Sequence, residues 1–365
     1  MKVAILAYEF YPLNLGGLGT HLRHLSDGLK DICDLEVFLP FKMKAPGLKI
    51  IEVPVKDAKK YVTKSYKLDK VIKYNKILPE KFREFPADVV HAHDWVTIDG
   101  GRRIKEEFGV PLVMTIHSSI LGKKKLTGSF VREKKELEKS IYSADRYIAV
   151  SRHTKNELVE LYGLDRKKID VIYNGIEYDK FRTGPDKNYI FFLGRLDQMK
   201  GVHFLVEAYS MIKDDIPQKL LLCGTGNNEY REFIMKMISE LGLKNHVTIR
   251  GRLKENELVK LYSEASIVAL PSVYEPFGIT VLEGMASGKA VITTTRSGAS
   301  EIVDNWKNAV VVKSGDSKDL ARAMKKLLLD DKLRDKISSN ALKLAKLYSW
   351  DNIARETLKV YRKVA

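Results

Sequence analysis

The sequence predicts an α/β protein with two doubly wound domains that face each other across a cleft. Short apolar, β-branched runs alternate with helical patterns along almost the whole chain, which is typical of βαβ units and parallel sheets. The chain has 365 residues, more than a single core usually supports. A turn-rich segment, residues 181–188, interrupts the alternation near the middle of the chain.

Each expected strand is an apolar run that is bounded by turn residues or by a helical pattern. The strands expected in the first half are residues 3–8, 35–40, 50–55, 88–93, 111–117, 146–151 and 169–175. Those expected in the second half are residues 190–195, 220–224, 247–251, 267–272, 290–294 and 309–315. Helical patterns lie between most of them, and helices from about residue 317 close the chain.

The linker between the domains is expected around Gly184 and Pro185. We therefore expect a first domain over residues 1–183 and a second domain over residues 184–348. Residues 349–365 are expected to form a C-terminal helix that returns to the first domain. In doubly wound sheets, ligands bind beyond the carboxyl ends of the strands, so functional residues should directly follow strands.

The composition predicts a cytoplasmic globular protein. Hydrophobic residues make up 44% of the chain, and no apolar run approaches the length of a membrane span, about 18 residues. Cys33 and Cys223 are the two cysteines, and each stands alone in an apolar setting. Neither a disulfide framework nor a C-x-x-C metal pair can therefore be built.

The chain is basic, with 63 Lys and Arg against 47 Asp and Glu, a net charge of +16. Such an excess suits anionic ligands, acidic lipid surfaces or nucleic acid. Residues 56–84 and 122–140 concentrate it, with Tyr61, Tyr66 and Tyr74 among the cations of the first segment. Solvated helix faces explain these segments more simply, and no nucleic-acid-binding module is recognisable. Abundant lysine and glutamate with scarce glutamine is also typical of proteins from very hot environments.

Gly16, Gly17 and Gly19 follow the first strand and precede a helix that is expected to begin near Thr20. Glycines in such a loop let the backbone come close to a bound phosphate or sugar. Their spacing does not match the dinucleotide-binding fingerprint, and the later segment GMASGKA does not have the spacing of a P-loop. An NAD-binding or P-loop enzyme is therefore not expected.

Two cations follow a strand in the second half of the chain. Arg195 ends the strand, and Lys200 stands at the start of the next helix. Together they can neutralise a diphosphate, the guanidinium as a fork and the ammonium as a point charge. An ordinary surface pair is the alternative, but the position after a strand favours a functional role.

The segment from Glu275 to Glu283 combines two carboxylates with the start of a helix. Pro276 is favoured in a first helical turn, so we expect the helix to begin there, with Glu275 in the loop and Glu283 about two turns along. Backbone N–H groups at a helix start have no partner within the helix and attract anions. Here they belong to Phe277, Gly278, Ile279 and Thr280. The arrangement suits a nucleotide sugar, which carries hydroxyls at both ends and a diphosphate between them.

Histidines gather near two strand ends and in the first helix. They are His21, His24, His91, His93 and His117. No acidic or cysteine residue has the spacing of a further metal ligand, so His21, His24 and His91 are expected to pack in the core or to support other site residues. The chain contains no D-x-D sequence, which argues against a diphosphate chelated by a metal.

These motifs together resemble a known family. The G-G-L-G loop, HAHDW, G-R-L-x-x-x-K-G and E-P-F-G-x-x-x-x-E, in this order and spacing, are similar to those of retaining glycosyltransferases of the GT-B fold, particularly family 4 and the related glycogen and starch synthases. The resemblance spans Val3 to Trp350. It implies two Rossmann-like domains, a nucleotide-sugar donor, a carbohydrate or glycolipid acceptor, and neither a metal nor another cofactor.

The resemblance also implies roles for residues of the second half. Arg195 and Lys200 are expected to bind the donor diphosphate. Glu275 is expected to hold hydroxyls of the transferred sugar, and Glu283 the ribose hydroxyls. Backbone contacts to the diphosphate and the frame around the base are expected from Gly278, Ile279, Thr280, Arg250 and Leu253.

In the first half, the resemblance implies that Gly16 and Gly17 approach the diphosphate. His117 matches a histidine near the sugar and the diphosphate, and Asp94 matches an acid on the acceptor side. The anomeric configuration is expected to be retained without a covalent nucleophile, since the departing phosphate assists the incoming hydroxyl.

Asn14 departs from the glycogen and starch synthases, which usually carry a lysine there. The broader interpretation is therefore favoured: a metal-independent retaining transferase that moves a hexose to a sugar, polysaccharide or lipid-linked acceptor, the last at the inner face of a membrane. The alternatives are a glucan synthase that uses ADP- or UDP-glucose, a sugar-nucleotide epimerase of the same fold, and a basic protein that binds nucleic acid or membrane surfaces.

Overall fold

The computed structural model describes residues 1–13, 16–62, 66–127 and 136–365, apart from the side chains of residues 124–127. The chain forms two compact units: the first domain contains Met1–Gly175 and Trp350–Ala365, and the second domain contains Ile176–Ser349. The boundary expected at residue 183 is thus too late. The reason is that Ile176 N donates to Tyr348 O (2.8 Å) and Lys180 pairs with Glu255, which ties residues 176–183 to the second domain.

The first domain is built on a seven-stranded parallel sheet with the order β3-β2-β1-β4-β5-β6-β7. Its strands are β1 (Lys2–Leu6), β2 (Asp34–Leu39), β3 (Lys49–Glu52), β4 (Val89–His93), β5 (Leu112–Ile116), β6 (Arg146–Ala149) and β7 (Ile169–Val171). Every residue of β4 and β5 is buried. This explains the continuous apolar runs in the sequence, because parallel strands are covered on both faces.

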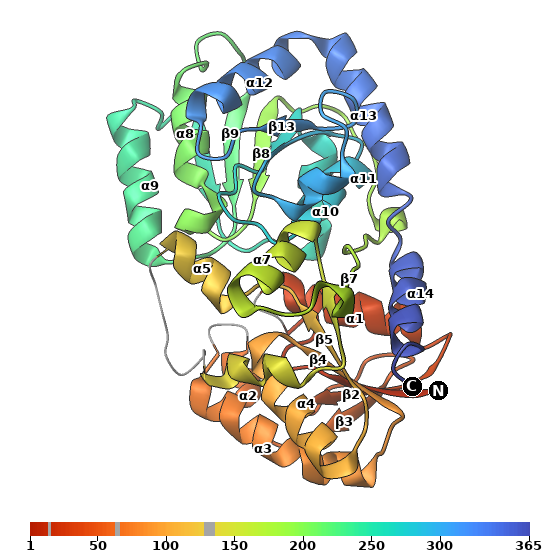
Figure 1. Ribbon diagram of the computed structural model, residues 1–365. Coiled ribbons are helices and arrows are strands. Elements are labelled where there is room, and N and C mark those ends of the chain that lie inside the picture. The colour runs from red at the N-terminus through yellow and green to blue at the C-terminus, as the bar shows by residue number, and fades with distance from the viewer. Residues whose placement is uncertain (14–15, 63–65, 128–135) are drawn as a thin grey trace. The chain divides into compact units, whose positions relative to one another are not determined.

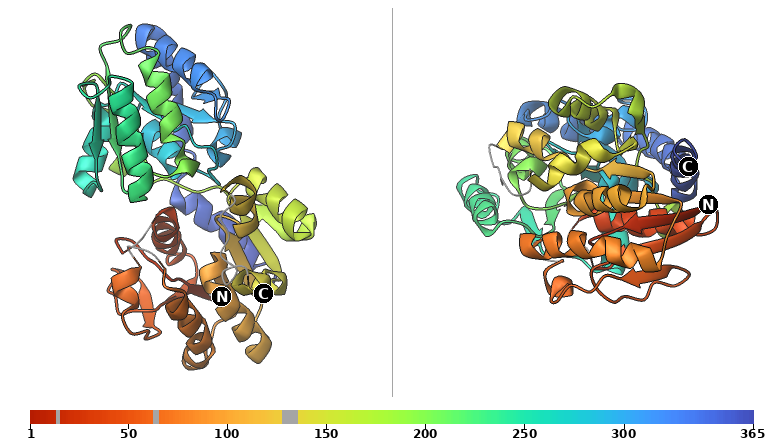
Figure 2. Two further views of the ribbon diagram at one scale, coloured as in Figure 1. Left: turned by 90° about the vertical axis from the view of Figure 1, so that its left-hand side faces the viewer. Right: turned by 60° about the horizontal axis from the view of Figure 1, so that its bottom comes forward.

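The helices of the first domain include one from the far end of the chain. They are α1 (Gly17–Leu29), α2 (Ala58–Tyr61), α3 (Leu68–Glu84), α4 (Asp94–Phe108), α5 (Ile120–Thr127), α7 (Arg152–Tyr162) and α14 (Trp350–Tyr361), with 3-10 turns η1 (Lys139–Ser143) and η2 (Arg166–Lys168). The C-terminal α14, dark blue in Figures 1 and 2, packs along α1, drawn in red. A Cβ on Gly28 would lie 2.9 Å from Cβ of Ala354, so this close packing requires glycine.

The second domain is built on a six-stranded parallel sheet with the order β10-β9-β8-β11-β12-β13. Its strands are β8 (Tyr189–Leu193), β9 (Lys219–Cys223), β10 (Val247–Arg250), β11 (Ile267–Ala269), β12 (Ala290–Thr294) and β13 (Val310–Val312). Its helices are α8 (Val202–Ser210), α9 (Asn228–Glu240), α10 (Glu255–Glu264), α11 (Ile279–Ala286), α12 (Ser317–Leu329) and α13 (Asp331–Ala345), with 3-10 turns η3 (Tyr178–Lys180), η4 (Gln198–Lys200) and η5 (Gly298–Ile302).

Both sheets reverse their strand order once, between β1 and β4 in the first domain and between β8 and β11 in the second. Right-handed crossovers then place the helices before and after each reversal on opposite faces. Accordingly, α8 contacts α9 and α12, whereas α11 contacts α10 and α13 (Figure 1). The prediction of two doubly wound, Rossmann-like domains is confirmed, and the reversal points are where such sheets bind ligands.

Local signals set the ends of several helices. The Ser151 side chain accepts from Thr154 N (3.0 Å) at the start of α7, and Gly163 ends that helix with a φ of +66°. Asp316 accepts from Asp319 N (2.9 Å) at the start of α12. Among the described residues, no helix is long and apolar enough to cross a membrane.

Candidate active site

An ion pair between Lys200 and Glu275 lies at the strand-order reversal of the second sheet. Lys200 ends η4 in the loop after β8, and Glu275 lies in the loop after β11, the strand next to β8. Lys200 Nζ donates to Glu275 Oε2, and both side chains are mostly buried. The structure therefore brings together two of the predicted site residues, which are 75 positions apart in the sequence.

The segment around Glu275 is extended, and the helix that was expected to begin at Pro276 begins at Ile279. Glu275 N donates to Arg296 O (3.0 Å), and Gly298 N donates to Glu275 O (2.8 Å). Ala299 N donates to Phe277 O (2.8 Å). This strand-like pairing with the loop after β12 holds the backbone around Pro276 out of the helix.

Gly278 turns the chain from this extended segment into α11. Its φ is +99°, a conformation that side chains with a Cβ rarely adopt, and a Cβ there would lie 3.0 Å from Cγ of Glu275. The first N–H groups of α11, including those of Ile279 and Thr280, follow directly. Gly278 is therefore the position at which the extended segment that carries Glu275 turns into the predicted anion-binding helix start, and its backbone conformation favours glycine.

Asp197 positions both predicted cations of the second domain. Its Oδ1 accepts from Lys200 N (3.1 Å), which fixes the turn η4, and its Oδ2 pairs with Arg195 (2.9 Å). The Arg195 side chain is about half exposed, at 48%, so its guanidinium is accessible to a ligand. Sequence analysis did not single out Asp197, although an acid at a helix N-cap is a recognisable signal.

The nearby glycines of CGTG serve packing. A Cβ on Gly224 would lie 1.9 Å from Gly194 O, and a Cβ on Gly226 would lie 2.1 Å from Leu196 O. These glycines let the loops after β8 and β9 run side by side, with Leu196 N donating to Thr225 O (3.0 Å). The expectation that this segment does not form a dinucleotide-binding loop agrees with this role.

Glu283 lies on α11 and is held by a residue that sequence analysis missed. Tyr262, on α10, donates its hydroxyl to Glu283 Oε2 (2.7 Å). Burial raises the pKa of Glu283, while the hydrogen bond from Tyr262 and the charge of Lys180 act in the opposite direction. No motif marks Tyr262, because its relation to Glu283 depends on how two helices pack.

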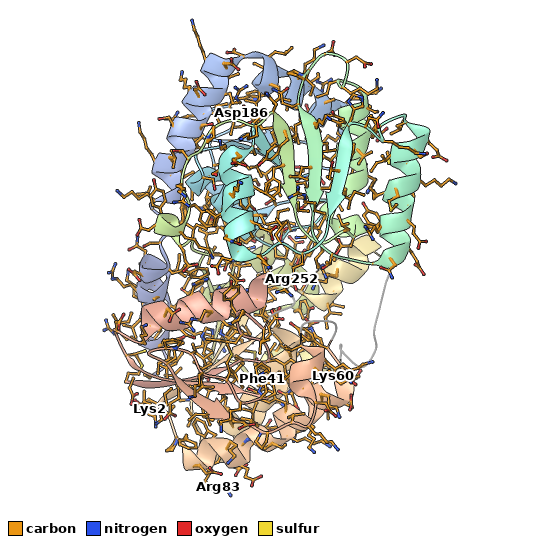
Figure 3. The ribbon with its side chains drawn as sticks, turned by 180° about the vertical axis from the view of Figure 1, so that it is seen from behind. Lys2, Phe41, Lys60, Arg83, Asp186 and Arg252 are labelled. Carbon is orange, nitrogen blue, oxygen red and sulfur yellow. The ribbon has the colours of Figure 1, made fainter. Side chains whose placement is uncertain are left out.

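Arg250 and Leu253, the predicted frame for the base, flank the loop that joins β10 to α10. Arg250 ends β10 with an exposed side chain, and Leu253 is half-buried. Figure 3 labels Arg252 in this loop. The loop therefore offers cations and a partly exposed apolar side chain.

In the first domain, the glycine loop leads into α1 earlier than expected. The helix begins at Gly17, with Gly16 as its N-cap, not near Thr20. A Cβ on Gly16 would contact nothing within 4 Å, and both glycines are exposed. Glu9 anchors the first turn by accepting from Gly19 N (2.6 Å). Asn14 lies outside the described residues.

Asp94 links β4 to the loop after β5. It begins α4 with a φ of +51°, and its Oδ1 accepts from His117 N (2.6 Å) and from Ser118 N (3.3 Å). Burial raises the pKa of Asp94 to about 6. His117 and Asp94, both predicted site residues, are thus in direct contact beside the reversal between β1 and β4.

The histidines form one cluster in the first domain. His91 is satisfied as expected, since it bonds with Tyr361 Oη and Thr115 Oγ1, each at 2.7 Å. His24 stacks on Trp350, with ring centroids 5.6 Å apart. His21, in contrast, uses only Nδ1, and its buried Nε2 has no hydrogen-bond partner among the described residues. His21 is buried in the core of the first domain, which agrees with the expectation for it.

Two of the three tyrosines of segment 56–84 form hydrogen bonds within the first domain, whereas the ring of Tyr61 has the ammonium groups of Lys60 and Lys67 over it, 5.8 and 5.6 Å from its centroid. Tyr66 donates to Glu9 Oε2 (2.5 Å), and Tyr74 is fully buried and donates to Phe38 O (2.8 Å). Several cations of the segment are paired, for example Lys81 with Glu84 (2.8 Å). Of segment 122–140, residues 128–135 lie outside the described residues. The structure therefore favours a solvated helix face for segment 56–84.

Two family models match the chain. The model described as "Glycosyltransferase Family 4" matches residues 15–180, and "Glycosyl transferases group 1" matches residues 176–344. An uncharacterised glycosyltransferase of Methanocaldococcus jannaschii is 31% identical over 99% of this chain and 98% of its own length. A glycogen synthase of Mycobacterium tuberculosis is 26% identical over 99% of this chain and 94% of its own length.

Solved structures share the fold. Sucrose-phosphate synthase from Thermosynechococcus elongatus matches with a TM-score of 0.85 and 22% identity, over 100% of this chain and 98% of that one. Anabaena HepE in complex with UDP-glucose matches with a TM-score of 0.79 and 22% identity, over 100% of both chains. The chain therefore belongs to the group 1, family 4 glycosyltransferases, which have the GT-B fold and are retaining hexosyltransferases that transfer sugar from a nucleotide sugar.

Proposed function

We propose that the chain transfers a hexose to a sugar, polysaccharide or lipid-linked acceptor without a metal at the diphosphate. The observation that carries this proposal is the Lys200–Glu275 ion pair beside the start of α11, at the reversal point of the second sheet. The absence of a D-x-D sequence supports the assignment of leaving-group charge to protein cations.

In the proposed donor complex, Lys200 and Glu275 no longer pair with each other and bind the donor instead. Lys200 and Arg195 bind the diphosphate, and Glu275 accepts from hydroxyls of the sugar. Without donor, Lys200 and Glu275 neutralise each other, so neither partly buried charge is left alone. Gly278, Ile279 and Thr280 offer N–H groups to the diphosphate, and Glu283 accepts from the ribose.

The first domain is proposed to bind the acceptor. Burial raises the pKa of Asp94 to about 6, which suits a group that accepts a proton from, or orients, an acceptor hydroxyl near neutral pH. His117 is held by its backbone bond to Asp94 and is proposed to lie near the donor sugar, and Gly16 and Gly17 near the diphosphate. The incoming hydroxyl is assisted by the departing phosphate, which retains the anomeric configuration.

The test is transfer from UDP-glucose and ADP-glucose by the wild type and by Lys200→Ala and Glu275→Gln. We expect both variants to lose at least about 100-fold in turnover while their unfolding stays cooperative, since groups aimed at developing charge contribute on this scale. Lys213→Ala, which removes a cation paired with Asp214 in the same domain, is the control and keeps the wild-type rate. Wild-type rates in both site variants would refute the proposal.

The same assay separates the acceptors. Elongation of maltooligosaccharides would identify the glucan synthase that the 26% identical glycogen synthase suggests. The preferred donor is identified most directly by measuring how much each nucleoside diphosphate and each nucleotide sugar stabilises the protein. A ligand at 100 times its Kd adds about 2.7 kcal/mol to the free energy of unfolding.

A further inference from the structure

We propose that His21, His93 and His117 form a binding site in the first domain for a divalent transition metal, with Zn²⁺ as the best-suited ion. His21 lies on α1, His93 ends β4, and His117 follows β5. One ring nitrogen from each of them lies within 4.8 Å of the others. All three residues belong to the first domain.

The distance between two of the ligand atoms is close to that of a zinc site. His93 Nδ1 and His117 Nε2 are 3.2 Å apart. Two ligands on one tetrahedral Zn²⁺, with bonds of about 2.0–2.1 Å, are about 3.3 Å apart. The third histidine, His21, has its ring centroid 4.4 Å from that of His117.

Asn174 determines which ring nitrogen of His21 can bind a metal ion. Asn174 Oδ1 lies 2.8 Å from His21 Nδ1 and can only accept, so Nδ1 carries the proton. Nε2 then bears a lone pair, and it is buried without a partner among the described residues. A ligand histidine whose second nitrogen donates to an oxygen is the usual arrangement in metal sites.

His93 is fully buried, and its Nδ1 is the ring nitrogen that lies beside His117 Nε2. Buried polar groups in native proteins are almost always paired, so the Nε2 of His21 in the same cluster, unpaired among the described residues, calls for a ligand.

The chemistry of the cluster selects the class of metal. All three candidate ligands are imidazoles, and among the described residues the cluster contains no carboxylate ligand. Neutral imidazole suits Zn²⁺, Ni²⁺ and Cu²⁺ rather than Mg²⁺ or Ca²⁺. Three protein ligands leave a fourth position for water or an added ligand. His117 is only half-buried and gives the ion a way in.

The test is titration of the metal-free protein, without donor, with Zn²⁺ by calorimetry and with Co²⁺ by visible absorption. We expect one ion per chain and the intense visible bands of tetrahedral Co²⁺. Because no sugar nucleotide is present, the result does not depend on the proposed function.

Ligand variants identify the site. His21→Gln and His117→Gln are expected to weaken Zn²⁺ binding at least tenfold. Asn174→Ala, which keeps all three ligands, should weaken it about 10- to 100-fold. His246→Gln, in the second domain, is the control and binds as the wild type does. The proposal is overturned by the absence of saturable binding, or by unchanged affinity in Asn174→Ala and in whichever ligand variants fold.

Discussion

Tyr262 on α10 donates a 2.7 Å hydrogen bond to Glu283 on α11, so the carboxylate proposed to accept from the ribose is already oriented before any donor binds. Tyr262→Phe removes that donor and leaves a buried carboxylate oxygen without it. We expect the free energy of unfolding to fall by about 1–3 kcal/mol. We also expect weaker donor binding, because the carboxylate is no longer held in place.

Tyr209→Phe is the matched control for this variant. Tyr209 is fully buried in the same domain, and its hydroxyl donates to Gln218 O (2.8 Å), away from Glu283. Its loss should cost similar stability in urea unfolding without changing the Kd of the donor. Equal donor affinities in the two variants would contradict the role given to Tyr262.

Gly278→Ala tests the turn into α11. Its φ of +99° and the 3.0 Å approach of a Cβ to Glu275 predict a stability loss of about 1–3 kcal/mol and a shifted Glu275 carboxylate. The rate of sugar transfer should fall by more than the loss of stability alone explains. Gly251→Ala is the control, since a Cβ there contacts nothing within 4 Å. Thermal unfolding and initial rates of both variants check the prediction, which fails if Gly278→Ala retains full activity.

The buried carboxyl group of Glu138 should make the free energy of unfolding depend on pH. Burial raises its pKa to about 7, although its carboxylate accepts from Tyr162 Oη and Ile120 N. Because the pKa in the folded state lies above the usual value of 4.5, the folded chain holds an extra proton between these two pH values. This contribution to stability is lost as the pH rises from 4.5 to 7.

Glu138→Gln lacks this dependence. The free energy of unfolding of the variant, minus that of the wild type, should therefore rise by about 1.4 kcal/mol per pH unit across that window. Urea unfolding at a series of pH values measures the difference. A difference that stays constant with pH would show that Glu138 does not titrate with a raised pKa.

Tyr361→Phe tests the contribution of α14 to the first domain. The hydroxyl of Tyr361 bonds with His91 Nδ1 (2.7 Å) in the core, so its removal should cost about 1–3 kcal/mol. Hydrogen exchange should speed up in β4 and α1, with the second domain unaffected. Tyr142→Phe, at a side chain that is 61% exposed, is the control and should change neither the free energy of unfolding nor the hydrogen exchange. Faster exchange confined to the second domain would refute the assignment.

The parts of the fold that could be predicted from sequence depend on local signals. The buried strands β4 and β5 appear as unbroken apolar runs, and the loops after β1, β8 and β11 carry the motifs that point to the site. Right-handed crossovers then leave few topologies. These signals were enough to predict two doubly wound domains and to single out Lys200 and Glu275, each in a loop after a strand.

The remainder depends on contacts between distant residues. Pro276 is a proper signal for a helix start, but the extended pairing of Glu275 and Phe277 with residues 296–299 overrides it. The bond between His21 and Asn174 joins residues 153 positions apart, and no spacing rule anticipates it. Side-chain partners of this kind become visible only when the packing of the helices is known.

The return of α14 to the first domain affects the order in which the protein can mature on the ribosome. Residues 1–175 emerge first, yet Trp350 and Tyr361, which pack on their histidines, emerge only after the second domain. A domain usually folds as a unit soon after its residues appear. Here the first domain stays unfinished until α14 has emerged, and the residues of the second domain are complete before that point.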